Sequence, residues 1–179
     1  MAEQSLKRQL KVLTIPVFIE MALVMLLGAV DTVMLSRYSD NSVAAVGLDN
    51  QLISLVFLVY QFFSMGAAIL CAQYIGAGLR KRLVQVVGMA LAVNLILGLA
   101  VSVLLFFYTE GLLQLMGLRP ELMGDGLVYL KITGALSFFQ ALSLTFSASL
   151  RSADKVIYPM VVTGIVNVLN ILGNYAFIF

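Results

Sequence analysis

The sequence predicts an all-α integral membrane protein with five transmembrane helices, and three observations lead to this fold class. Of its 179 residues, 61% are hydrophobic and 11% are charged, with a mean hydropathy of +1.03. A soluble domain has about a quarter charged residues. The apolar residues form five long runs, and the basic residues gather in every second connection between these runs. A chain with this pattern has its spans in a bilayer and short loops outside it.

Each apolar run is long enough to cross the hydrocarbon core, which takes about 20 helical residues. The first run exceeds the apolar core of a signal peptide, about 7 to 15 residues, and has no small-residue cleavage site, so we expect it to remain in the membrane. Turn-forming residues occupy the connections: the polar segment 36–50, the Gly-rich basic segment 76–82 and Arg119-Pro120. The predicted spans are residues 12–35, 52–75, 83–108, 127–150 and 156–179.

Basic residues predict the orientation of the spans. Eight of the eleven Lys and Arg residues lie in the N-terminal segment, in 76–82 and in 151–155. The positive-inside rule then places the N-terminus in the cytoplasm. The last run ends at Phe179 without the polar or interfacial residues that usually close a span, so we interpret the chain as a piece of a longer protein. The alternative is a naturally short protein whose last helix ends at the membrane surface.

Composition also excludes several kinds of chemistry. The chain has no His and a single cysteine, Cys71, which excludes internal disulfides, Cys/His zinc sites and His-based catalysis. The glycines of 76–80 match a phosphate-binding loop only weakly, and a turn explains them. We therefore expect no enzyme activity and no cofactor. The basic residues are dispersed rather than gathered on one face, so we expect no nucleic-acid partner.

Two ionisable residues lie inside the first span, where a charge costs at least about 2.5 kcal/mol and calls for a partner, a cavity or a function. Glu20 and Asp31 are 11 residues apart, which places them within about 20° of one helix face. Pro16 shares this face and is a candidate hinge. Gly28 leaves space near Asp31 for an ion, water or a helix. Two structural alternatives remain: Asp31 reaches the hydrated interface, and Glu20 is a protonated acid bonded to a neighbouring helix.

The fifth span carries a second polar face. Thr163, Asn167, Asn170 and Asn174 follow the i, i+4, i+7, i+11 spacing of one helix face. Their amide oxygens are suited to a small cation, and their N–H groups to a carboxylate. The alternative is hydrogen bonding between helices, worth about 1 kcal/mol per pair or less.

The other spans carry weaker polar patterns. The fourth has a broad polar face that predicts either a water-filled cavity or a packed polar seam. Asn94, Gly98 and Ser102 in the third span favour helix packing. Methionines such as Met21 and Met25 suit either a pocket for apolar cations or a lipid-facing surface. The candidate substrate-cavity residues are Gln61, Gln140, Asn167 and Thr163.

Several segments together resemble one transporter family. They are the stretch Pro16–Leu48, which contains "GAVDTVMLSRYSD", then "AQYIGAG" at 72–78, "LRP" at 118–120, "SLRSADK" at 149–155 and "NILGNYAFIF" at 170–179. In this order and spacing they resemble the multidrug and toxic compound extrusion family, from about Leu13 to the last residue.

The resemblance implies an antiporter of twelve helices in two six-helix lobes, which moves organic cations out of the cell across the cytoplasmic (inner) membrane. Sodium or protons flowing inward would drive it. Residues 1–179 would be an incomplete amino-terminal lobe with five of its six helices. The carboxyl-terminal lobe would come from the same longer chain or from a second subunit.

Site residues follow from the same resemblance. The family's first helix carries an aspartate that binds the coupling ion, and Asp31 stands at that position. One branch adds an Asn and an Asp, four residues apart, from the fifth helix. Here the pair is Asn170 and Asn174, and the lost carboxylate should weaken a sodium site. Proton coupling through Asp31, Na⁺ at Asp31, or an ion site in the other lobe all stay open.

Our hypothesis is that Asp31, next to Asn170, Asn174 and Glu20, alternates between a loaded and a free carboxylate. Loading would favour a bent first helix around Pro16, and the lobes would rock around a midplane cavity. One alternative is a flippase for lipid-linked precursors, whose anionic substrate would need several basic residues deep in the spans, and none lies there. The other alternative is a membrane scaffold subunit without transport.

Overall fold

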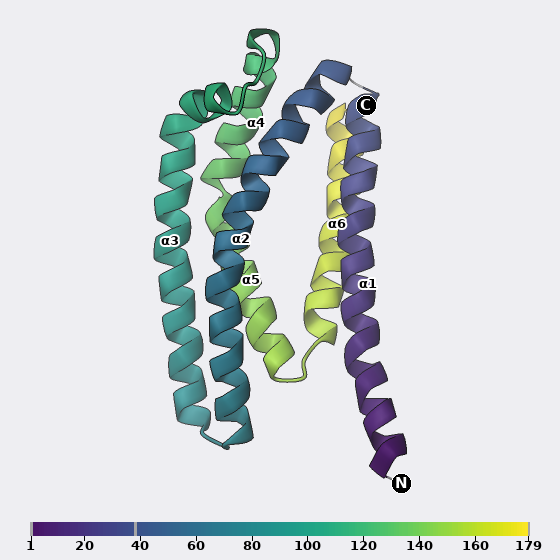
Figure 1. Ribbon diagram of the computed structural model, residues 1–179. Helices are drawn as coiled ribbons and strands as arrows, with labels where there is room; N and C mark the ends of the chain where they lie inside the picture. Colours follow the sequence, from purple (N-terminus) through teal and green to yellow (C-terminus); the bar gives the residue numbers. More distant parts are fainter. Residues whose placement is uncertain (1, 38, 179) are drawn as a thin grey trace.

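The computed structural model describes the backbone of residues 2–37 and 39–178, and the side chains of residues 10–37, 39 and 41–176. The described chain is helical and contains no strand, which confirms the all-α class (Figure 1). Four single helices of the described chain are long and apolar enough to cross a membrane, and the number is five if the bent pair Pro120–Ala135 and Ser137–Ser152 counts as one broken span. The elements are α1 (Ala2–Ser36), α2 (Asp40–Gly76), α3 (Arg80–Leu115), a 3-10 helix η1 (Pro120–Leu122), α4 (Met123–Ala135), α5 (Ser137–Ser152) and α6 (Ile157–Ile178).

The helices form two groups. Helices α1 and α6 pack side by side along their length, whereas α2, α3, α4 and α5 pack together (Figure 1). Contacts between the groups are sparse. The N-terminus, the α2–α3 connection and the α5–α6 connection lie at the same end of the bundle. The basic segments therefore share one end, as the sequence predicts, and the cytoplasmic location of this end stays a prediction.

The segment 36–50, predicted as a polar connection, is mostly helix. Helix α2 begins at Asp40, and the Ser39 side chain caps it by accepting the Ser42 N–H at 3.4 Å. The prediction is wrong for 40–50 because polar residues there hide an amphipathic pattern. Ala45 and Leu52, on one face of α2, are buried in a cluster with residues of α3, α4 and η1. The predicted last residue of the fifth span, Phe179, lies outside the described residues.

The fourth predicted span, 127–150, is not one straight helix. It is broken at Leu136 between α4 and α5, which differ in direction by 44°. A break in hydrocarbon leaves backbone groups that need new partners. The Phe138 N–H donates to Ser102 Oγ of α3 at 3.2 Å, and Ser137 Oγ lies 3.0 Å from Ser102 Oγ and 3.1 Å from the Tyr60 hydroxyl. Hydroxyl groups from three helices thus stabilise the break.

A buried polar seam joins α2, α3 and α5. Asn94 Nδ2 donates to Thr145 Oγ1 at 2.5 Å and to Ser64 Oγ at 3.2 Å. Beside it Gly98 brings α3 against α5, because a Cβ at this position would stand 2.9 Å from the Phe138 Cα. The packing interpretation of Asn94, Gly98 and Ser102 is confirmed. Ser137, which belongs to the predicted polar face of the fourth span, is buried against Tyr60 and Ser102, whereas Thr145 of the seam lies outside that predicted face.

Replacing Gly98 with Ala should destabilise the protein by about 1 to 3 kcal/mol, because the new methyl group must push the backbones of α3 and α5 apart. Gly88→Ala on the same helix is the matched control, since a Cβ there meets nothing within 4 Å. It should leave stability unchanged or raise it through helix propensity. Thermal unfolding of both variants in the same detergent measures the difference. Equal melting temperatures would contradict the packing proposed for Gly98.

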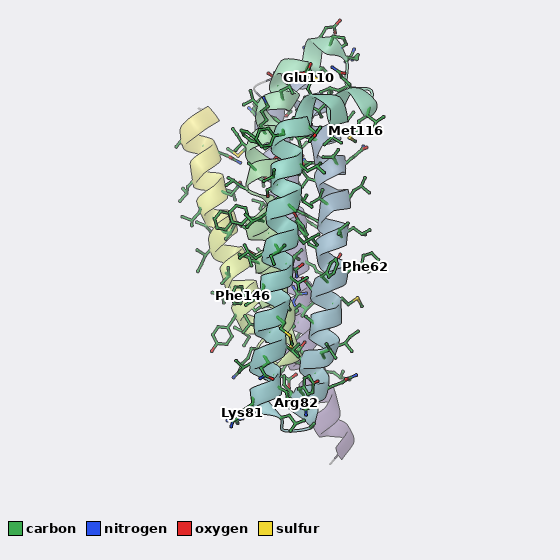
Figure 2. All side chains as sticks on the ribbon, turned by 90° about the vertical axis from the view of Figure 1, so that its left-hand side faces the viewer. Phe62, Lys81, Arg82, Glu110, Met116 and Phe146 are labelled. Carbon is green, nitrogen blue, oxygen red and sulfur yellow. The ribbon has the colours of Figure 1, made fainter. Side chains whose placement is uncertain are left out.

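The outer surface of the bundle is apolar between its two ends. Figure 2 shows Lys81 and Arg82 near one end, Glu110 near the other, and Phe62 and Phe146 between them. Phe62 is 69% exposed and Phe146 52% exposed. Aromatic side chains exposed in this way suit contact with lipid rather than with water. Met21 and Met25 of α1 are exposed as well, and neither lines the cavities described below.

Candidate functional site

The structure joins three of the predicted site residues in one hydrogen-bonded group between α1 and α6. Asn174 Nδ2 donates to Asp31 Oδ1 at 2.7 Å and to Asn170 Oδ1 at 2.9 Å. All three side chains are half-buried. The helical period brings Asn170 and Asn174 to the same face of α6, and that face packs on α1. This group provides carboxylate and amide oxygens that could bind a small cation. Because Asp31 is only half-buried, its carboxylate is accessible to a proton or an ion.

The space around Asp31 is open on its own helix. A Cβ built on Gly28, three residues before Asp31, meets no atom within 4 Å. This fits the predicted room for an ion, water or a helix. Asn174 donates to Oδ1 of Asp31, so a proton or a small cation can bind at Oδ2 while this hydrogen bond stays in place.

The remaining polar residues of α6 act in packing. Asn167 Nδ2 donates to the Leu23 carbonyl of α1 at 2.7 Å. Nearby, a Cβ on Gly164 would lie 3.8 Å from Leu23 Cδ1, so the two helices approach closely here. Thr163 lies half-buried on the same face. Asn167, a candidate for the substrate cavity, thus lies in the α1–α6 contact.

Glu20 does not join the Asp31 group. Its Oε1 accepts a hydrogen bond from Arg151 Nη2 of α5 at 2.7 Å and forms a salt bridge with it. Glu20 is only 6% exposed, and its Oε2 has no hydrogen-bond partner among the described residues. This ion pair connects the α1–α6 group to the α2–α5 group one helical turn from Pro16. Helix α1 runs without interruption through Pro16, and a hinge there stays a prediction.

A polar cavity lies beside this ion pair. It has a volume of about 450 Å³ and lies between α2 and α5. Gln61, one of the predicted cavity residues, lines it together with Ser64, Ser147 and Arg151. Gln140, Asn167 and Thr163 are not among its lining residues. The four predicted cavity residues therefore do not form one pocket within this chain.

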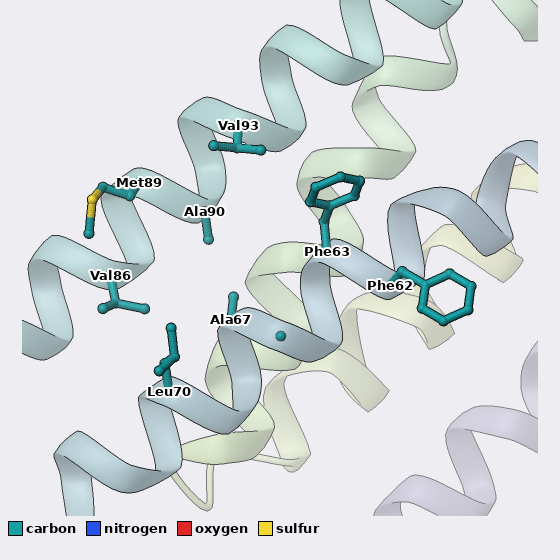
Figure 3. A pocket seen from close by; sticks show the side chains of 9 residues that line it. Phe62, Phe63, Ala67, Leu70, Val86, Met89, Ala90 and Val93 are labelled. Carbon is teal, nitrogen blue, oxygen red and sulfur yellow. The ribbon is translucent and has the colours of Figure 1, made fainter.

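A second cavity, of about 370 Å³, lies between α2 and α3 and is apolar (Figure 3). Ala67 and Leu70 of α2 face Val86 and Ala90 of α3 across it, whereas Phe62 points away from α3. It contains no charged side chain and lies apart from Asp31 and from Glu20. Its lining has no charged or hydrogen-bonding side chain that could bind a proton or a small cation, so we do not assign it to the ion-coupling site.

The structure reveals a buried carboxylate, Asp49, in the segment 36–50, for which the sequence predicts a polar connection. Asp49 of α2 is 0% exposed, and neither carboxylate oxygen has a hydrogen-bond partner among the described residues. The signal was available, because Asp49 follows Ala45 by four residues and precedes Leu52 by three, on the apolar face of a helix. The prediction of a connection over 36–50 missed this face, because a face of this kind exists only in a helix.

A family model called MatE matches residues 16–176, nearly the whole chain. The chain belongs to the MatE family. Its relatives are transporters, and MatE proteins are multi-pass membrane proteins, in agreement with the apolar helices. One relative is the uncharacterized transporter YisQ of Bacillus subtilis, 44% identical over 93% of this chain and 37% of its own length.

Further relatives carry drug-resistance names. The probable multidrug resistance protein NorM of Thermotoga maritima is 36% identical over 97% of this chain and 38% of its own length. The multidrug resistance protein PmpM of Pseudomonas aeruginosa is 33% identical, over 96% of this chain and 36% of its own length. This chain thus spans well under half the length of these MatE relatives.

Solved structures agree on the MatE fold. A transporter of the MOP superfamily from Pyrococcus furiosus matches with a TM-score of 0.88 and 24% identity, over 97% of this chain and 38% of that one. An outward-facing multidrug resistance transporter of the MATE family matches with the same TM-score and identity. At this identity the likeness concerns the fold.

Proposed function

We propose that this chain is the amino-terminal lobe of a secondary transporter that expels organic cations in exchange for inflowing protons or sodium. The observation that carries the proposal is the Asp31–Asn174–Asn170 group between α1 and α6. A half-buried carboxylate in a membrane helix is costly unless it serves a function or has a partner. The group that donates to Asp31 here is the uncharged amide of Asn174, so one negative charge remains for a coupling ion to neutralise.

Binding of the ion at Asp31 couples the transporter to the ion gradient, and this gradient supplies the free energy for extrusion. When a proton or a sodium ion binds Asp31, the α1–α6 contact becomes neutral and can repack, and the unloaded state restores the charge. Membership of a family of multidrug transporters supports outward movement of the substrate. Asn174 stands where a second carboxylate would hold sodium more tightly, so we favour the proton as the coupling ion. A second lobe supplies the opposite wall of the substrate cavity, and the basic end of the bundle faces the cytoplasm.

The test is ion-driven transport by the complete transporter that contains this lobe, reconstituted in liposomes. A proton gradient directed against the organic cation should drive its extrusion, and a sodium gradient of the same size should drive less. A fluorescent organic cation reports the movement. Extrusion that neither gradient changes would overturn ion-coupled antiport, and a complete absence of extrusion under both gradients would favour the scaffold alternative. A preference for sodium would retain antiport and overturn the proton assignment.

A lipid-linked precursor flippase gains no support from the cavity beside α5. Arg151 is the single basic residue that lines this cavity, and it already pairs with Glu20 at 2.7 Å. An anionic headgroup would have to compete with this carboxylate, and the other polar groups of the wall are hydroxyls and an amide. Organic cations therefore remain the substrate class that we propose.

A further inference from the structure

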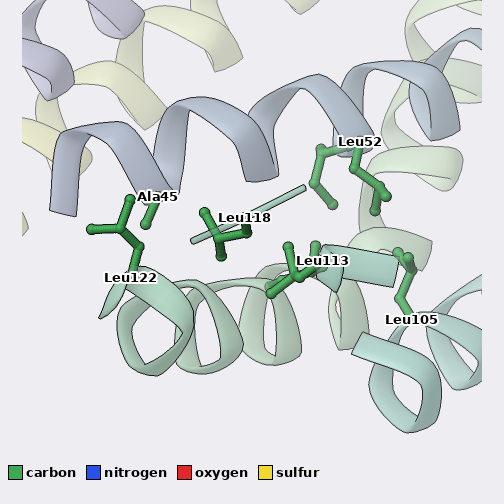
Figure 4. Packing of buried hydrophobic residues seen from close by; sticks show 8 residues of the cluster. Ala45, Leu52, Leu105, Leu113, Leu118 and Leu122 are labelled. Atoms are coloured by element: carbon green, nitrogen blue, oxygen red, sulfur yellow. The ribbon is translucent and has the colours of Figure 1, made fainter. Parts of the chain in front are cut away.

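Asp49 lies in a setting that differs from that of Asp31. Figure 4 shows the apolar cluster around it: Ala45 and Leu52 of α2 lie opposite Leu118, Leu122 and Leu113. Asp49 lies on the same face of α2, between Ala45 and Leu52, and is fully buried. A Cβ built on Gly126 of α4 would stand 3.7 Å from Asp49 Oδ1 and 2.8 Å from Leu118 Cδ2. The carboxyl group is therefore buried beside apolar side chains, and neither of its oxygens has a hydrogen-bond partner among the described residues.

Groups that could neutralise Asp49 are engaged elsewhere or remain at a distance. On α4, Asp125 accepts a hydrogen bond from Ser42 at 2.6 Å, and the Tyr129 hydroxyl donates to Asn50 Oδ1 at 3.2 Å. On α3, the Thr109 hydroxyl donates to the Leu105 carbonyl. The charged side chains at this end of α3, on η1 and in the connection before it are exposed, and so is Lys131 of α4; the first three are Glu110, Arg119 and Glu121. No described cation pairs with Asp49.

A buried carboxylate without a partner costs several kcal/mol when ionised, and the group then takes up a proton instead. A metal ion does not solve the problem here. A sodium ion needs several oxygen ligands, whereas Asp49 Oδ1 shares the space beside Gly126 with methyl groups of Leu113 and Leu118. A proton needs only the carboxylate itself. The chemistry of this site therefore selects H⁺.

We propose that Asp49 holds a proton in the folded protein and forms a second proton-binding site of the lobe, separate from Asp31. Asp49 can release its proton only when α4 moves away from α2 and water enters the cluster. The proposal stands whether or not Asp31 drives transport.

The first experiment detects the proton directly. Infrared spectra of the complete transporter in lipid nanodiscs at neutral pH should contain the carbonyl-stretch band of a protonated carboxyl group, and Asp49→Asn should remove one such band. Asp125→Asn is the matched control, because Asp125 is an exposed aspartate on the adjacent helix, and its spectrum should keep the band. The proposal would be overturned if the spectra of the wild type and of Asp49→Asn showed the same protonated-carboxyl bands.

The second experiment uses stability. As pH rises above about 4, an unfolded chain releases the Asp49 proton to water whereas the folded chain must keep it. The melting temperature of the wild type should therefore fall relative to Asp49→Asn between pH 5 and about 8, and Asp125→Asn should follow the wild type. A constant difference across this range would overturn the proposal.

Two further measurements keep the test decisive. Asp49→Leu should fold and show the same pH-independent behaviour as Asp49→Asn, because its neighbours are apolar. If Asp49→Asn does not fold, Asp49→Leu replaces it in both experiments. Sodium added at fixed pH and ionic strength should not change the melting temperature of the wild type relative to either variant. A sodium-dependent rise that both variants lose would overturn the proton site in favour of a cation site.

Discussion

Replacing Asp31 with Asn should reduce ion-driven extrusion by the complete transporter to the background of protein-free liposomes. The new amide can still accept the hydrogen bond that Asn174 Nδ2 donates at 2.7 Å, so the α1–α6 contact should survive. What disappears is the charge that binds a proton or sodium ion. Without it the two states of the site have the same charge, and an ion gradient has no differential affinity on which to act.

The measurement is extrusion of a fluorescent organic cation at equal amounts of reconstituted protein, together with the melting temperature of each variant. Asp154→Asn is the matched control, because Asp154 is an exposed aspartate whose φ of 59° Asn tolerates well. Asp154→Asn should transport like the wild type. Gradient-driven extrusion by folded Asp31→Asn at the wild-type rate would remove Asp31 from the coupling site.

Replacing Arg151 with Leu should destabilise the protein by about 2 to 3 kcal/mol. The change leaves Glu20, which is 6% exposed, without the side chain that pairs with it among the described residues. Removing one partner of a fully buried ion pair costs about 3 to 5 kcal/mol, and we expect less here because Arg151 is 39% exposed. The loss also separates α5 from α1, since this ion pair joins the two helix groups.

Charge neutralisation should rescue this variant. The double variant Glu20→Leu/Arg151→Leu removes the unpaired charge and should recover most of the stability, because two apolar side chains can replace an ion pair. Lys155→Leu is the control for adding an exposed leucine near the end of α5, and it should stay near wild-type stability. Thermal unfolding in one lipid mixture ranks the four proteins. A double variant no more stable than Arg151→Leu would show that the arginine acts through packing alone.

The period of the helix explains why the Asp31 group could be predicted from sequence. Residues 170 and 174 are one turn apart, so any helix in this segment presents both amides on one face. Polar faces in hydrocarbon turn towards other helices rather than towards lipid. The hydrogen bonds of Asn174 to Asp31 and Asn170 fit both statements. The family resemblance predicted that the first span, with Asp31, would face these amides of the fifth span. A role of this group in ion coupling remains our proposal.

The same local argument failed for Glu20 and for the fourth span. Glu20 shares a face with Asp31 along α1 but pairs with Arg151, 131 residues further along the chain. The break at Leu136 depends on Ser102 of α3, which accepts the released Phe138 N–H. Both outcomes require knowing which helices meet at a given depth, and residue spacing within one helix contains no such information.

The sequence by itself determined the membrane-spanning fold class, the approximate position of each span and the polar faces, because hydrophobic length and helical period are local properties. The tertiary structure decided which polar residues meet, where a helix breaks and which carboxylate is left without a partner. Asp49 shows the difference most clearly. A polar residue in a polar segment becomes a buried acid once α4 and η1 cover α2, because burial is a property of the packed helices and not of the segment.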